Sequence, residues 1–319
     1  MNDRKIWRRY FITNYVRTYY NAAVLKLKLP KLVAKPKFTK PVLECDAANQ
    51  QIRRFIEAGT PALVSRFGCV ESKCIGEGIG IRNAQLKKFS RLTLQMIHNN
   101  AGVFPYGEDM AQRFCDIAVK SAKQVDLLGV WNTEMHDYLV NNVCPENVMI
   151  TPLESLDPWN SNVPWTKALQ DKRVLVIHPF EESIKKQYAR RELLFESSDI
   201  LPSFHLEVLK AIQTVGGNRD ERFNDWEDAL NYMYEQSLKT SFDVAIIGCG
   251  AYGMPLGAML KDAGKTVIHL GGVTQILFGI KGKRWDENKT SELYNQYWIR
   301  PSESEVPNNA CSVEDACYW

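Results

Sequence analysis

The stretch SFDVAIIGCGAYGMPLGAMLKDAGKTVIHLGG, residues 241–272, decides the fold of this chain. Its apolar run 243–247 ends at a glycine, which is typical of a strand buried on both faces of a parallel sheet. A helix with Pro255 in its first turn follows and ends before Gly264. Residues 266–270 form the return strand, which lies parallel to the first when the crossover is right-handed. The unit predicts a Rossmann-like α/β domain with a mostly parallel sheet and flanking helices.

The glycine-rich turn of this unit is a candidate phosphate-binding site. The G-x-G-x-x-G spacing permits a sharp turn and leaves backbone N–H groups at a helix N-terminus open to an anion. A second glycine pair and the basic segment GIKGKRW at 279–285 strengthen the prediction. The alternative is that the glycines only allow tight packing of the strand on the helix, and that the basic segment is a solvated surface. The candidate ligand contacts here are Gly248, Gly250, Ala251, Tyr252, Gly253, Gly271, Gly272, Gln275, Lys281 and Arg284.

The end of the second strand argues against a dinucleotide. An NAD site of this type needs an Asp or Glu there to bind the ribose hydroxyls. The chain has His-Leu-Gly-Gly at 269–272 instead. Methyltransferases with a glycine turn usually need an acid on the next strand too, so the same absence disfavours them.

Two further strand ends carry candidate functional residues. Arg66 follows an apolar strand and suits a phosphate or carboxylate, and Gly68 and Glu71 lie in the turn beyond it. Glu71 suits a general base, an acceptor for a sugar hydroxyl or a metal ligand. The alternative is a salt bridge between Arg66 and Glu71 that fixes the turn. His178 suits a phosphate contact or a proton carrier, although strand-end histidines are often structural.

The remaining elements follow from periodicity and from turn residues. Strands are predicted at 60–65, 125–131, 147–151 and 172–178, helices at 48–58, 83–100, 110–122, 224–237 and 291–298, and a flexible loop around Gly76, Gly78 and Gly80. Parallel strands end at one edge of a sheet, so Arg66, His178 and the glycine turn are expected to converge. The aromatic C-terminus is expected to dock near them.

Composition fits a globular protein. Of 319 residues, 45% are hydrophobic and 24% charged, and no apolar run approaches the roughly 20 residues that a membrane span needs. No signal peptide is recognisable. The eight cysteines form no C-x-x-C pair, which favours reduced thiols in the cytoplasm over a zinc or disulfide framework.

The first forty residues differ from the rest. They contain eleven Lys or Arg and one acid, a charge of +10, so the remainder carries −7 of the total +3. Residues 1–41 are therefore predicted as a basic amphipathic segment and linker, and 42–319 as the Rossmann-like domain. Interleaved cations and aromatics suit a helix lying on an anionic membrane surface. Packing on its own domain, or on a second copy in a homo-oligomer, is the alternative. The acidic remainder disfavours nucleic acid.

Four segments resemble the GT-D-type bacterial glycosyltransferases, the DUF1792-like group: SRFGCVE at 65–71, VIHPFEESIKKQY at 176–188, the block 246–285 and the ending WIRPSESEVPNN with CYW. The resemblance covers about residues 50–319. It implies a GT-D-like fold and hexosyl transfer from a nucleotide-diphosphate sugar, with a UDP-sugar favoured. The acceptor would be a glycan or lipid-linked glycan in surface polysaccharide biosynthesis (capsule or O-antigen). It also implies a cytoplasmic enzyme, at the inner face of the cell membrane if 1–40 binds there.

One position departs from this resemblance. The relatives carry Asp-x-Glu in the R-F-G turn, associated with a divalent metal, whereas this chain has Cys69-Val70-Glu71. Only Glu71 carries over, and a thiol is a poor ligand for Mg²⁺ or Mn²⁺. The resulting hypothesis has the glycine turn and basic segment bind the diphosphate while Glu71 takes the acceptor proton. Two other functions stay open: an NAD-dependent oxidoreductase that uses the Gly248–Gly253 turn, and a non-catalytic membrane-associated assembly subunit.

Overall fold

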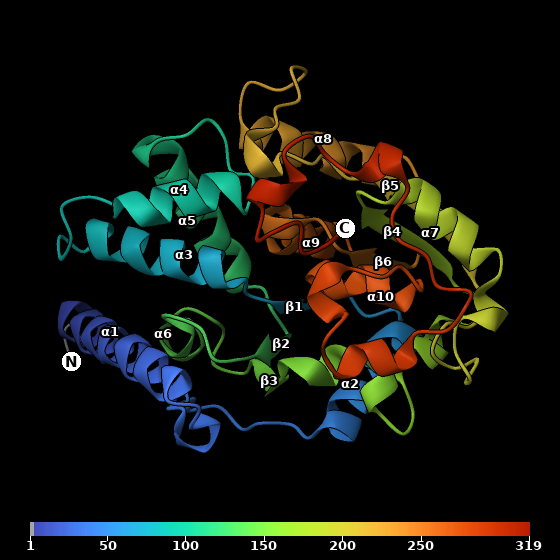
Figure 1. Cartoon of the computed structure of the whole chain (residues 1–319), viewed down its shortest axis with the longest axis horizontal. Helices are drawn as coiled ribbons and strands as arrows, with labels where there is room; N and C mark the ends of the chain where they lie inside the picture. The colour runs from blue at the N-terminus through green and yellow to red at the C-terminus, as the bar shows by residue number, and fades with distance from the viewer. Residues whose placement is uncertain (1–2) are drawn as a thin grey trace.

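The computed structural model describes residues 3–319 and has a Rossmann-like α/β fold. A sheet of seven strands, all parallel, runs in the order β3-β2-β1-β7-β6-β4-β5. Figure 1 shows the N-terminus at one edge of the molecule and the C-terminus near the centre of the view. The strands are β1 (Ala62–Arg66), β2 (Leu127–Val130), β3 (Met149–Pro152), β4 (Arg173–His178), β5 (His205–Lys210), β6 (Val244–Ile247) and β7 (Thr266–His269).

Helices cover both faces of the sheet. One face packs against α3 (Cys69–Arg82), α5 (Glu108–Ala122), α8 (Trp226–Leu238) and α9 (Gly253–Asp262). The other face packs against α2 (Cys45–Ala58), α7 (Glu181–Tyr188) and α10 (Thr274–Leu277). The helices α1 (Asp3–Lys26), α4 (Arg91–Asn99) and α6 (His136–Asn142) add to the first side. In residues 3–319 no helix combines the length and apolarity that a membrane crossing requires.

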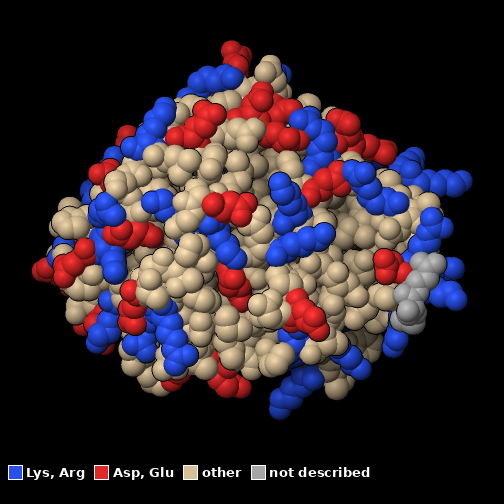
Figure 2. All heavy atoms as spheres, turned by 180° about the vertical axis from the view of Figure 1, so that it is seen from behind, with Lys and Arg blue, Asp and Glu red and all other residues tan. Residues whose placement is uncertain are grey.

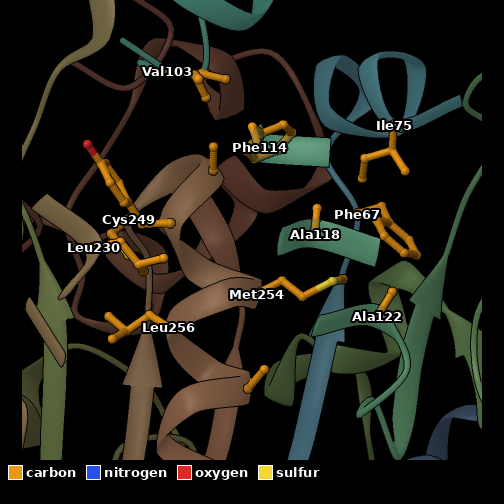
Figure 3. Packing of buried hydrophobic residues seen from close by; sticks show 14 of the residues in the cluster. Phe67, Ile75, Val103, Phe114, Ala118, Ala122, Leu230, Cys249, Met254 and Leu256 are labelled. Atoms are coloured by element: carbon orange, nitrogen blue, oxygen red, sulfur yellow. The ribbon is translucent and has the colours of Figure 1, made fainter. Parts of the chain in front are cut away.

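The central strands are apolar because both of their faces are buried. On β6, Ala245 and Ile247 belong to one hydrophobic cluster, and Val244 and Ile246 to the other. Figure 3 shows the first cluster, where Met254 of α9 lies beside the α5 side chains. The expected strand, glycine turn, helix and parallel return strand at 241–272 are confirmed.

The predicted loop at Gly76, Gly78 and Gly80 was wrong, because these residues lie inside helix α3. A Cβ at Gly76 would collide with Met135, and one at Gly80 with the indole of Trp7. The glycines therefore let neighbouring segments approach the helix, and this requirement outweighs their low helix propensity.

Other boundaries also differ from the prediction. The helix expected at 83–100 begins only at Arg91, where the Ser90 hydroxyl caps the Thr93 N–H. The expected helix at 291–298 is wrong. Only Lys289–Leu293 is helical there, as a 3₁₀ turn, because the side chains of Asn295 and Trp298 bond to the carbonyl of Leu194. Strand β5 was not predicted, since its half-exposed edge lacks a continuous apolar run.

The N-terminal helix α1 packs on its own domain, which was one of the alternatives considered for the basic segment. Trp7 is buried, and its Nε1 donates to the carbonyl of Gly76 over 2.9 Å. Arg17 forms a buried ion pair with Asp137 of α6. Figure 1 shows α1 alongside α6 and below α3.

Candidate functional site

A cavity of about 460 Å³ lies at the carboxyl ends of the central strands. The four adjacent strands β1, β7, β6 and β4 each contribute the residue at or just beyond their ends, namely Arg66, His269, Gly248 and His178. This edge is where open α/β sheets usually bind their ligands. The expected convergence of the strand ends is therefore present in the structure.

The cavity brings together eleven of the fourteen residues predicted as site residues: Arg66, Gly68, Glu71, His178, Gly248, Gly250, Tyr252, Gly271, Gly272, Gln275 and Arg284. Ala251, Gly253 and Lys281 do not line it. Ala251 faces a smaller pocket behind Glu71, of about 20 Å³. Gly253 begins α9 and packs against the His269 ring, where a Cβ would not fit.

The glycine turn has two unused backbone donors, of which the one on Gly250 belongs to a residue that lines the cavity. Gly250 has φ +59°, and no atom lies within 4 Å of where its Cβ would be, so the backbone here is uncovered. The N–H groups of Gly250 and Ala251 open a 3₁₀ turn, and neither donates to another backbone group of residues 3–319. Such orphan donors next to the start of a helix favour an anion.

Two arginines, Arg66 and Arg284, line the cavity, and of these Arg66 has no acidic partner among residues 3–319. Among residues 3–319 no carboxylate lies within ion-pair distance of its guanidinium, and its buried Nε has no hydrogen-bond partner. Its contacts are the carbonyl of Phe67, at 3.3 Å, and the Trp131 ring, whose centroid lies 5.4 Å away. The guanidinium also packs on Gly271 at the end of β7. A positive charge held in this way has donors left for a ligand anion.

Glu71 lies in the first turn of α3 and forms no salt bridge with Arg66, so the alternative considered for this pair is wrong. Its carboxylate folds back over the Cα of Gly68. Burial raises the pKa of Glu71, and hydrogen bonding to its own backbone N–H and the charge of Arg66 oppose that rise. The carboxylate thus lines the same cavity as Arg66 and is a better base than an exposed one.

Two neutral histidines contribute to the cavity wall. The Nδ1 of His178 accepts from the Phe180 N–H over 3.0 Å, which leaves a proton on Nε2. Burial lowers the pKa of His178 to about 3. His269, which bonds Ser65 at 2.9 Å, has a pKa lowered to about 3 by burial and by Arg66. Each ring is therefore neutral at pH 7, and His178 suits hydrogen-bond donation better than proton uptake.

The basic segment 279–285 does not supply free cations. The ammonium of Lys281 lies 5.3 Å from the centroid of the Tyr294 ring, away from the cavity. Lys283 donates to the carbonyl of Asp315, and Arg284 pairs with Glu314 and the Tyr318 hydroxyl. These contacts hold the C-terminal segment in place.

The C-terminus docks at the cavity, as predicted. Tyr318 and Trp319 line it, and the amide of Gln275 donates to the Tyr318 carbonyl over 3.0 Å. With Trp131 and Phe180 these rings give the cavity an aromatic wall. Tyr252 is instead a core residue that stacks on Trp226, with ring centroids 4.8 Å apart.

Sequence reasoning missed several lining residues. Trp131, His269 and Glu314 were not proposed as site residues, nor was the segment 212–215 after the unpredicted β5. The position of His269 at the end of a central strand was a usable signal. Nothing local in the sequence distinguishes Glu314.

The donor set does not fit a divalent metal. No group of three or more His, Cys, Asp or Glu in residues 3–319 is arranged to hold one. Burial and the neighbouring Glu71 raise the pKa of the Cys69 thiol, so it stays protonated. Glu71 alone offers a hard oxygen ligand beside Arg66, and Glu314 is already paired with Arg284.

Comparison of the chain with family models, curated proteins and solved structures found no match. The class that fold and cavity define is a Rossmann-like α/β protein with a cavity at the carboxyl ends of its central strands.

Proposed function

We propose that this protein is a glycosyltransferase that binds a nucleotide-diphosphate sugar in the cavity. The main support is Arg66, a guanidinium without a carboxylate partner among residues 3–319, which faces the cavity together with Gly250, whose backbone N–H is unused. Together they match a pyrophosphate, which needs both charge and directed donors. The aromatic wall offers stacking surfaces for the base or the sugar.

The residues suggest a division of roles during transfer. An acceptor hydroxyl oxygen bonds to the anomeric carbon, and the bond from that carbon to the β-phosphate oxygen breaks. The hydroxyl proton passes to Glu71, whose raised pKa favours uptake. The nucleoside diphosphate leaves with the bonding electron pair, and Arg66 and the Nε2–H of His178 stabilise its charge. The resemblance to GT-D enzymes suggests surface glycans as acceptors and a UDP-sugar as donor.

An NAD-dependent oxidoreductase fits this cavity less well. β7 ends at His269, and Leu270, Gly271 and Gly272 follow without an acidic side chain. A ribose diol at this strand end would therefore lack its usual carboxylate partner.

The Glu71→Gln variant tests the proposal, because it removes the base and keeps the shape. We expect release of nucleoside diphosphate from a panel of UDP- and GDP-sugars, with simple glycosides as acceptors, to fall by about 10²–10⁴-fold. Binding of the nucleoside diphosphate should change by less than about threefold, since the charge-binding groups are intact. Glu57→Gln, at an exposed position on α2, is the matched control.

Equal loss of binding and of transfer would instead show that Glu71 is structural or binds a metal. Tight NADH binding without binding of any nucleotide sugar would reject the proposed class.

A further inference from the structure

The inner face of α1 fixes how this helix is rotated on the domain. Its buried residues are Trp7, Asn14, Arg17 and Val24. Arg17 bonds Asp137 at 2.8 Å, and the Asn14 amide donates to the same carboxylate at 2.9 Å. These contacts are specific, so the opposite face of α1 points outward.

The outward face is also apolar, so α1 is not amphipathic in the usual sense. Ile12, Tyr15, Val16 and Tyr19 are 52%, 58%, 60% and 62% exposed. Among residues 3–319, sixteen large hydrophobic side chains are exposed, and nine of them lie in the short segment 12–32. A concentration of this kind marks an interaction surface. We call residues 12–32 the exposed apolar segment.

Exposed cations precede the exposed apolar segment and also lie within its C-terminal part. Lys5, Arg8 and Arg9 are exposed before it, and Lys26 and Lys28 lie within its C-terminal part. No ion pair joins any of these five to a carboxylate in residues 3–319. Figure 2 shows Lys and Arg gathering along the edge of the molecule that corresponds to α1 in Figure 1.

We propose that the exposed apolar segment and these five cations bind an anionic lipid surface. Tyrosines and aliphatic side chains would enter the interfacial region, and the long basic side chains would reach the headgroups. The positive charge of the N-terminal residues favours a lipid surface over a second copy of the chain as the partner. Residues 1–40 carry +10 in each copy, which opposes self-association through this face and favours a negative surface. The inference is independent of the function of the cavity.

Cosedimentation of the full chain with vesicles tests the proposal. We expect binding to vesicles of phosphatidylglycerol and phosphatidylcholine, and at least about tenfold weaker binding to phosphatidylcholine alone, with loss at high salt. The Tyr15→Ser/Val16→Ser/Tyr19→Ser variant should bind at least about tenfold more weakly. Arg8→Gln/Arg9→Gln should lose roughly 25-fold, about fivefold per cation.

A matched control replaces exposed apolar residues elsewhere. Leu193 and Leu238 are 45% and 44% exposed, and Leu193→Ser/Leu238→Ser should bind vesicles like the wild type. Unchanged melting temperatures would show that the variants fold. Absence of wild-type binding, or equal binding to neutral vesicles, would overturn the proposal. So would a dimer in sedimentation velocity that disappears in the Tyr15/Val16/Tyr19 variant, because it would identify a second copy as the partner.

Discussion

Two arginines that point into the molecule show how differently the same side chain is used. Arg17, in α1, is 8% exposed, and its guanidinium bonds the carboxylate of Asp137, the amide of Asn14 and the carbonyl of Thr133. Arg66, at the end of β1, has a buried Nε without a partner, and no carboxylate of residues 3–319 lies within ion-pair distance.

The difference separates a structural contact from a binding site. A buried charge is costly unless it is paired, so a satisfied arginine holds elements together. An unsatisfied arginine beside a cavity reduces the stability of the empty protein and is explained by a ligand that supplies the missing anion. The Arg17–Asp137 contact therefore has a structural role between α1 and α6, whereas Arg66 belongs to the candidate binding site at the strand ends.

The largest effect should follow the loss of Arg17. Arg17→Leu leaves Asp137 buried without its partner, which should lower the free energy of unfolding by about 3–5 kcal/mol. Urea denaturation measures it. The Arg17→Leu/Asp137→Leu double variant should recover part of that loss, because no unpaired charge remains. A double variant as unstable as the single one would show that the pair is not the cause.

A smaller effect, of a different kind, is expected at Arg66. Arg66→Leu should lower the free energy of unfolding by no more than about 1 kcal/mol, since no ion pair is broken. Affinity for UDP should fall about 10–100-fold with the loss of charge-assisted hydrogen bonds. Calorimetric titration measures it. Lys281→Ala, which removes a cation outside the cavity, is the control and should change affinity by less than about twofold. If Arg66→Leu bound UDP as tightly as the wild type, Arg66 would not be a ligand-binding residue, and its contrast with Arg17 would be wrong.

The third effect is spread over several pH units and concerns the pH dependence of stability. Burial holds the pKa of His178 at about 3, below its usual 6.5. Between these values the unfolded chain binds the proton and the folded chain does not, so stability falls as pH falls from about 6.5 toward 3. His178→Gln should reduce this slope by about 1.4 kcal/mol per pH unit between roughly pH 4 and 6.

Urea denaturation at several pH values measures that slope. His205→Gln, at an exposed position of β5, is the matched control. An unchanged slope in His178→Gln would mean that the histidine is protonated in the folded protein, and its role as a neutral donor would then be wrong.

The fold was predictable because its main signals are local. The apolar strands, the glycine turn and the helix from Gly253 all follow from neighbouring residues, as does the meeting of parallel strand ends. The glycines of α3 were misinterpreted because their reason is tertiary. They make room for Trp7, which lies about seventy residues away in the sequence.

The site was predictable in its location but not in its charges. Arg66, Glu71 and the glycine turn were placed together from strand ends alone. Which cation lacks a partner depends on where the C-terminal segment docks, because Glu314 neutralises Arg284 there. No spacing in the sequence reveals that pairing. Lys281 was expected to contact the ligand, but its ammonium lies over the Tyr294 ring. This contact, too, cannot be recognised from the spacing of residues in the sequence.

The most direct test of the central claim is a crystal structure of the chain with UDP, grown with a chelator of divalent metals. We predict the diphosphate at the carboxyl ends of β1 and β6, with phosphate oxygens on the guanidinium of Arg66 and on the backbone N–H of Gly250. A nucleotide bound elsewhere, or an Arg66 that turns to a carboxylate of the protein while the cavity stays without nucleotide, would contradict it.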